Sequence, residues 1–243
     1  MIPILRKLCL TQYRGASGVR MVDSGRAGPT AAILACTHGN EPAGLEAMDY
    51  LLSGLVLNRG RVLFIVVNPE AARCGMRYID HNMNRLPPHP DDWAGTVEGG
   101  RLKEIRPILW EIDGGVLDLH STSADAPPML ISVNKVSEEM AKNPQMPFTH
   151  IVNGLPAHLS GRLIVDYCSH APIKLVAECG QHACPDAANR GVQVSLAFLR
   201  KLEMIDGGTV TAQTLAPKDY YRVVAPLRLP KDKGEFRLVK QLA

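Results

Sequence analysis

Residues 31–41 read AAILACTHGNE, an apolar run that ends on a polar segment containing His38 and Glu41. A short apolar run closed by polar and glycine residues is typical of a strand buried on both faces. Asn40 is suited to cap a following helix, and apolar residues recur at helical spacing over residues 45–55. The stretch therefore predicts a strand, a polar turn and a helix in succession.

Four further apolar runs predict strands. They span residues 61–67, 115–119, 129–133 and 173–177. Helical spacing over residues 102–109 predicts a helix that bends or ends near Pro107, and Asp186 is suited to cap another. Strands that alternate with helices indicate an α/β fold with a mixed, mostly parallel sheet flanked by helices.

This regularity is lost in two places. Residues 68–100 have weak periodicity and many Pro, Gly, Asn and Asp residues, which predicts a long loop. Toward the C-terminus, apolar runs follow one another without helices between them. These runs cover residues 209–211, 220–224 and 236–239. We therefore predict a main α/β domain over residues 1–206 and a short or partial β appendage over residues 207–243.

The composition is that of a globular protein, with 46% hydrophobic and 21% charged residues. A net charge of +3 spread along the chain and only 5% aromatic residues argue against a nucleic-acid partner. No run approaches the roughly 18 apolar residues of a membrane span, and the first ten residues lack the order of a signal peptide. We expect a cytoplasmic protein whose six cysteines are reduced.

Three residues with metal-binding or catalytic chemistry stand where predicted strands end. His38 follows the first strand, His120 follows the run over residues 115–119, and Glu178 follows the run over residues 173–177. The carboxyl ends of parallel strands meet at one edge of an α/β sheet, which is where ligands bind. We therefore expect these three side chains to lie close together.

The spacing of His38 and Glu41 lets both reach one metal ion together with His120. Two histidines and one carboxylate leave a fourth tetrahedral position for water, which is the arrangement of catalytic zinc. Zinc lowers the pKa of such a water to about 7, and Glu178 would be the general base that takes its proton. Asp118 faces the same way as His120, either as its partner or simply as the end of the strand. We predict one zinc per chain, although ligand chemistry alone leaves other divalent ions open.

The segment RYIDHNMNR, residues 77–85, is dense in polar groups. Asn84 and Arg85 are suited to bind a substrate carboxylate, because a guanidinium pairs with a carboxylate through two hydrogen bonds. Arg77 is suited to stabilise the oxyanion of a tetrahedral intermediate, or else only to pair with Asp80.

Several blocks of this sequence occur in a fixed order along residues 31–202. The blocks are Thr37–Glu41, Asn68–Pro69, Arg77–Asp80 with Asn84–Arg85, Asp118–Thr122 and Glu178–Gly180. In this order they resemble the succinylglutamate desuccinylase/aspartoacylase family of the zinc carboxypeptidase superfamily. The resemblance implies a carboxypeptidase-like α/β/α domain that removes acyl groups such as acetyl or succinyl from amino acids.

The resemblance also implies a role for each candidate residue. The implied roles are zinc ligation by His38, Glu41 and His120, general base catalysis by Glu178, carbonyl polarisation by Arg77, and binding of the substrate carboxylate by Asn84 and Arg85.

The chain departs from the family pattern at several points. Asn82 stands where the family usually has an Asp that looks like a partner of a zinc-ligating histidine, so zinc affinity is expected to fall. Cys36 stands where Gly is common. The family's later tyrosine and arginine specificity residues have no evident counterpart between His150 and Cys168. Family members also carry a fuller C-terminal β domain, so we expect either a short member or a fragment.

Three functions remain open on the sequence. The leading hypothesis is a zinc-dependent amidohydrolase acting on a small N-acyl amino acid. A metallocarboxypeptidase that trims peptides would use the same centre. A metal-binding or ligand-sensing module with little turnover is the alternative that Asn82 and the short C-terminal region favour. A homo-oligomer is compatible with each, because a neighbouring subunit could complete the appendage.

Overall fold

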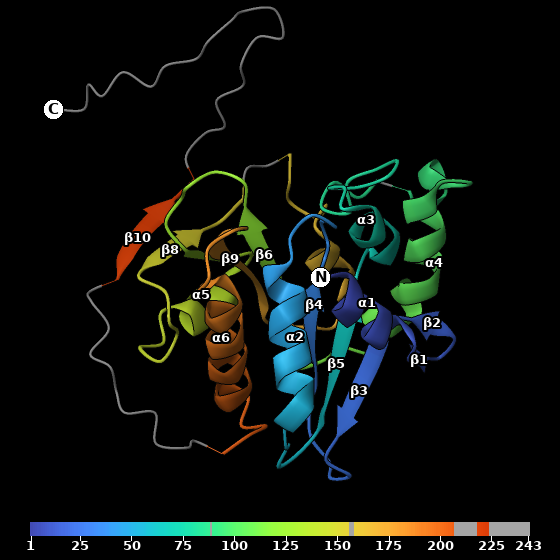
Figure 1. The fold of residues 1–243 in the computed structure, drawn as a ribbon. Coiled ribbons are helices and arrows are strands. Elements are labelled where there is room, and N and C mark those ends of the chain that lie inside the picture. The colour runs from blue at the N-terminus through green and yellow to red at the C-terminus, as the bar shows by residue number, and fades with distance from the viewer. Residues whose placement is uncertain (88, 156–157, 207–217, 224–243) are drawn as a thin grey trace, which may run out of the picture.

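The computed structural model describes residues 1–87, 89–155, 158–206 and 218–223. Its main sheet is made of β3 (Val19–Asp23), β4 (Thr30–Ala35), β5 (Arg61–Val66), β6 (Gly115–Thr122), β7 (Met129–Ser132), β8 (His150–Asn153), β9 (Lys174–Gln181) and β10 (Asp219–Arg222). The strand order is β10-β8-β7-β9-β6-β4-β5-β3 (Figure 1). β1 (Gln12–Tyr13) and β2 (Ala16–Ser17) form a separate antiparallel pair.

Most neighbouring strands of the main sheet run parallel. β3 is antiparallel to β5 and β7 is antiparallel to β9, whereas the other neighbours are parallel. Every residue of β4 is buried, as expected for a strand covered on both faces. Because β5, β4, β6 and β9 run parallel to one another, their carboxyl ends lie at one edge of the sheet. The predicted mixed, mostly parallel sheet is confirmed.

Helices cover both faces of this sheet. They are α1 (Ile2–Cys9), α2 (Ala43–Gly54), α3 (Pro69–Cys74), α4 (Val97–Leu109), α5 (Lys135–Ala141) and α6 (Ala187–Lys201), with the 3₁₀ helices η1 (Pro90–Trp93) and η2 (Ile164–Tyr167). α1, α2, α5 and α6 share one core cluster with Ile33 and Ala35 of β4, and α2 and α6 lie side by side (Figure 1). α4 and η2 share the other cluster with Ala32 and Leu34. Because side chains alternate across a strand, the two clusters lie on opposite faces.

Two local predictions were wrong, and a third was confirmed. Asn40 does not cap α2, which begins after Pro42 and has no side-chain cap. Residues 68–100 are not one loop, because Asn68 accepts a hydrogen bond from the Ala71 amide and starts α3, and η1 follows. α4 passes through Pro107 and ends at Leu109, so the predicted end of the helix near Pro107 is confirmed.

The predicted strand over residues 220–224 is found at Asp219–Arg222, where it pairs with β8 at the edge of the main sheet. The predicted strands over residues 209–211 and 236–239 lie outside the described residues. The division of the chain at residues 206 and 207 therefore stays a prediction. Within the described residues, no helix is long and apolar enough to cross a membrane.

Candidate metal centre

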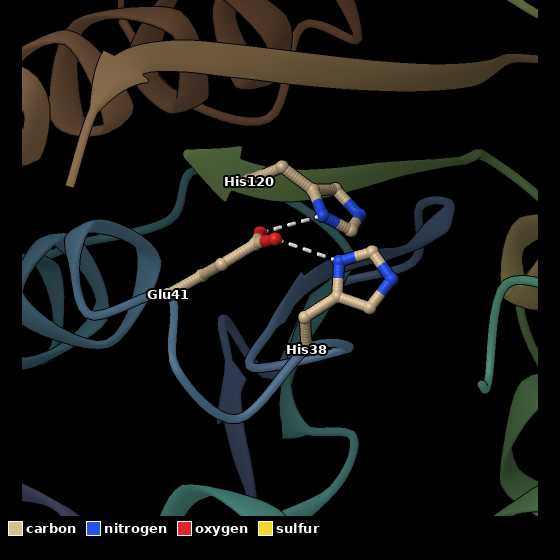
Figure 2. Close-up of side chains that lie close together, drawn as sticks. All are labelled: His38, Glu41 and His120. Atoms are coloured by element: carbon tan, nitrogen blue, oxygen red, sulfur yellow. Dashed lines mark hydrogen bonds and ion pairs between the residues drawn. The ribbon is translucent and has the colours of Figure 1, made fainter. Parts of the chain in front are cut away.

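Three side chains converge where β4 and β6 end (Figure 2). His38 follows β4, Glu41 lies just before α2, and His120 lies in β6; β4 and β6 are parallel neighbours. Glu41 Oε1 lies 2.7 Å from His38 Nδ1, and Glu41 Oε2 lies 2.8 Å from His120 Nδ1. One potential ligand atom from each residue lies within 4.8 Å of the others, and all three residues are buried. The cluster expected from the sequence is thus present.

The chemistry of this cluster suits a divalent cation. Two imidazole nitrogens and one carboxylate are the ligand types that zinc prefers. Burial favours the neutral acid of Glu41, but the adjacent His120 and His38 lower its pKa, so the carboxylate is ionised. Burial lowers the pKa of His38 and keeps its imidazole in the neutral form that ligates metals. Glu41 and His38 are therefore in the protonation states in which these side chains ligate metals.

His120 lies between two carboxylates. Its Nδ1 faces Glu41, its Nε2 lies 2.7 Å from Asp118 Oδ2, and Thr37 Oγ1 donates to Asp118 Oδ1 at 2.8 Å. Burial disfavours the imidazolium, but Asp118 and Glu41 raise the pKa of His120 well above its usual value. Positive charge is therefore favoured at this position, and a carboxylate behind a histidine is the arrangement that orients metal ligands.

His38 has an amide where His120 has a carboxylate. His38 Nε2 lies 3.1 Å from Asn82 Oδ1, which also accepts a hydrogen bond from the Asn84 amide at 2.8 Å. Asn82 therefore contacts the candidate ligand His38 directly. A neutral amide polarises the imidazole less than a carboxylate would. Asn82, in place of the family's usual Asp, is therefore expected to make His38 a weaker metal ligand.

Two backbone features direct His38 into the cluster. Cys36 has a φ of 52°, in the left-handed region that favours glycine, so the chain turns sharply as it leaves β4. Gly39 packs against α3, where a Cβ would lie 2.1 Å from the carbonyl carbon of Ala71. The Gly39 amide also donates to the carbonyl oxygen of Arg77 at 3.1 Å. Only glycine fits this close approach.

Gly39→Ala is expected to destabilise the fold by about 2–3 kcal/mol and to weaken zinc binding, because the turn carrying His38 must move away from α3. Urea denaturation combined with zinc titration measures both effects. Gly100→Ala is the matched control: it lies in α4 with no atom near the added methyl, so it should be neutral or stabilising by up to about 1 kcal/mol. Equal stability of the two variants would refute this prediction.

Glu178 lies in β9 opposite His120, its partner in the parallel β6–β9 register. Its Oε2 is buried and has no hydrogen-bond partner among the described residues. Burial raises the pKa of Glu178; nearby His120 opposes that shift, whereas Glu41 and Asp118 add to it. A carboxylate with a raised pKa next to a cation site is chemically suited to accept a proton from water.

The other predicted site residues lie around the same edge. Arg77 Nη1 donates to Glu41 Oε1 at 3.2 Å, and the side chain remains about half exposed. Asn84 is buried; its Oδ1 accepts from the Ile164 amide at 3.0 Å, and its Nδ2 lies 3.2 Å from His120 Nε2. Arg85 is exposed, and its Nη1 donates to the Asn84 carbonyl at 2.6 Å. Arg77 and Asn84 thus contact the cluster directly, and Arg85 borders it.

The sequence reasoning missed Arg162, which lies beside Arg85. Its guanidinium donates to the carbonyl oxygens of Leu86 at 2.8 Å and Arg85 at 3.4 Å. Burial lowers the pKa of Arg85, and the charges of Arg77 and Arg162 lower it further. Three guanidinium groups are therefore gathered at one end of the site. An arginine in a loop carries no sequence signal for such a contact, because the partner is 77 residues away.

Ser121 and His182 were also missed. The Ser121 amide donates to Glu41 Oε2 at 3.1 Å, and Ser121 Oγ lies 2.8 Å from His182 Nδ1. Ser121 follows His120 directly in β6, so it could have been found from its position in the strand. His182 gave no such indication, because it follows a bulge between β6 and β9.

The sequence profile of the succinylglutamate desuccinylase/aspartoacylase catalytic domain matches residues 27–148, which include all three residues of the cluster. The chain belongs to the succinylglutamate desuccinylase/aspartoacylase family. A succinylglutamate desuccinylase from Pseudomonas putida strain KT2440 is 41% identical over 95 residues. That alignment covers 37% of this chain but only 28% of the relative's length.

Solved structures share this fold. The product-bound ectoine utilization protein EutE from Ruegeria pomeroyi superposes with a TM-score of 0.66 at 19% identity, over 84% of this chain and 64% of that protein. Succinylglutamate desuccinylase from Chromobacterium violaceum superposes with a TM-score of 0.65 at 19% identity, over 92% and 80% of the two chains. These structures share the mostly parallel sheet flanked by helices that was expected from the sequence.

Proposed function

We propose that this chain is a zinc-dependent deacylase that hydrolyses the amide bond of a small N-acyl amino acid. The observation that carries the proposal is the buried cluster of His38, Glu41 and His120, with Glu178 on the adjacent strand. Membership of a family that includes succinylglutamate desuccinylases supports the same chemistry. One zinc per chain is proposed, held by the three residues of the cluster.

Each residue around the cluster has a role in this proposal. Zinc held there would act as a Lewis acid that activates water and polarises the scissile carbonyl. Glu178 takes the proton from the attacking water and later gives it to the leaving amine, a role that its raised pKa favours. Arg77 lies beside Glu41 and stabilises the negative charge that develops on the carbonyl oxygen.

The arginines around the site favour a substrate with carboxylate groups. Arg85, flanked by Arg77 and Arg162, lies where its guanidinium is destabilised by two neighbouring positive charges. A bound carboxylate relieves that repulsion and forms two parallel hydrogen bonds with a guanidinium. The Asn84 side chain supplies a further amide beside Arg85. We therefore propose an N-acyl derivative of an acidic amino acid as the substrate class.

Elemental analysis of the purified chain, alongside a screen of acetyl-, succinyl- and formyl-amino acids, tests the proposal. We expect about one zinc per chain and release of a free amine that stops when a chelator removes the metal. Cleavage of peptides instead would identify a metallocarboxypeptidase. Zinc binding without hydrolysis, even after Asn82→Asp supplies the missing carboxylate, would identify a binding module. Absence of zinc after reconstitution would refute the proposal.

Arg85→Ala is expected to raise KM for an N-acyl acidic amino acid by about 100-fold with a smaller change in kcat, because a bidentate ion pair with the bound substrate is lost. Steady-state kinetics at saturating zinc measure this split. Arg73→Ala is the matched control, because Arg73 is exposed on α3 and forms an ion pair with Glu70. An unchanged KM in Arg85→Ala would remove Arg85 from the substrate site.

A further inference from the structure

Glu98 is a buried carboxylate in the first turn of α4. Its Oε1 accepts hydrogen bonds from the Ile79 amide at 2.7 Å and from Asn68 Nδ2 at 2.9 Å. Its Oε2 accepts from the amides of Asp80 at 2.9 Å and His81 at 3.1 Å. Three consecutive backbone amides of one loop thus surround a single side chain.

This arrangement resembles an anion-binding site built from backbone amides, with the anion supplied by the protein itself. Burial raises the pKa of Glu98, but the amides of Ile79, Asp80 and His81 and the Asn68 side chain more than offset this and lower it. The N-terminus of α4 also favours negative charge. Glu98 is therefore ionised at neutral pH, and the loop folds around its charge.

The contact between loop and helix is reciprocal. While the Asp80 amide donates to Glu98, Asp80 Oδ2 accepts a hydrogen bond from the Val97 amide at 2.8 Å, in the first turn of α4. Each segment thus satisfies donors of the other. This clasp, formed by Glu98 and Asp80, ties the middle of the 77–85 loop to α4.

Residues on both sides of the clasp reach the metal centre. On one side, the Arg77 carbonyl accepts from the Gly39 amide, and the Arg77 guanidinium donates to Glu41. On the other side, Asn82 Oδ1 lies against His38 Nε2. The clasp therefore holds the short span whose two ends contact the candidate ligands.

We propose that Glu98 is a positioning residue that holds Arg77 and Asn82 at the metal centre without touching metal or substrate. Its effect on zinc affinity follows from the geometry of the loop alone. Its effect on turnover rests on the proposed function, because it acts through the arginine assigned to the oxyanion.

Glu98→Gln tests this with little change in size. The side-chain amide presents N–H donors toward backbone N–H groups, so part of the clasp is lost although the shape remains. Glu104→Gln is the matched control, because Glu104 lies on the same helix, is about half exposed and pairs with Arg101. Asp80→Ala, at an exposed position, removes the hydrogen bond that Asp80 accepts from the Val97 amide. This variant tests the clasp independently if Glu98→Gln folds poorly.

Three measurements separate positioning from bulk stability. Hydrogen exchange of residues 77–85 is expected to quicken by at least about tenfold in Glu98→Gln, less in Asp80→Ala and not in Glu104→Gln. Zinc affinity, measured against a competing chelator, is expected to fall about tenfold. At saturating zinc, kcat is expected to fall about 10- to 100-fold with KM changed by less than about threefold.

A double mutant isolates the action through Arg77. Glu98→Gln is expected to cost much less activity in an Arg77→Ala background than in the wild type, whereas a general loss of stability would cost the same in both. Unchanged loop exchange and zinc affinity in Glu98→Gln would overturn the inference. If no N-acyl amino acid is hydrolysed by the wild type, the proposed function fails, but exchange and zinc affinity still decide the role of Glu98.

Discussion

Glu178→Gln is expected to lower kcat by about 10³- to 10⁴-fold while the chain still binds about one zinc. The side chain lies opposite His120, its Oε2 has no hydrogen-bond partner among the described residues, and its pKa is raised by burial. Glutamine keeps the shape but cannot accept a proton. The lost acceleration corresponds to about 4–5 kcal/mol of transition-state stabilisation.

Steady-state kinetics and elemental analysis on the same preparation test this expectation, so that loss of zinc cannot be mistaken for loss of the base. Glu111→Gln is the matched control, because Glu111 is also a partly buried glutamate but pairs with Arg14 and Tyr13 outside the site. A kcat within tenfold of wild type in Glu178→Gln would assign the proton transfer to another group.

His120→Ala is expected to weaken zinc binding by at least about 1000-fold and to abolish detectable turnover, because one of three protein ligands is lost. The same change should destabilise the metal-free fold by about 3–5 kcal/mol. His120 lies between Glu41 and Asp118, and its removal takes away the partner that these two buried carboxylates share.

Competition with a chelator measures the affinity, and urea denaturation in the absence of metal measures the stability. His170→Ala is the matched control, because His170 is exposed and its Nδ1 forms a hydrogen bond with the Trp110 carbonyl. If His120→Ala bound zinc as tightly as the wild type, the ion would be held elsewhere and the proposed centre would be wrong. If metal-free His120→Ala were as stable as the metal-free wild type, the carboxylates of Glu41 and Asp118 would not need His120 between them.

The sequence by itself determined the framework of the site. The apolar run of β4 followed by a polar turn is a local pattern, and so is a strand that ends on His120 or Glu178. Because parallel strands of an α/β sheet end at one edge, the strand pattern alone predicts that these residues meet. Local patterns and this rule on parallel strands were enough to predict the metal-ligand cluster.

The local predictions were wrong where tertiary contacts override the conformational preference of the segment. Asn40 has the chemistry of a helix cap, yet α2 begins after Pro42, and Glu41, between these two residues, is turned toward the two histidines. Residues 68–100 look irregular, yet Asn68 starts α3 and also binds Glu98. In both segments, side chains form contacts with residues far along the chain, and local sequence patterns do not report such contacts.

Only the tertiary structure decided which side chains support the framework. No sequence pattern predicted that Arg162 contacts Arg85 or that Glu98 lies inside the 77–85 loop. The structure also shows that His38 is the histidine that Asn82 contacts. Periodicity and spacing report how a segment folds and which face it buries, but a hydrogen bond between two loops leaves no period in either. Such contacts are set by how the helices and loops pack around the sheet, which is a property of the whole chain.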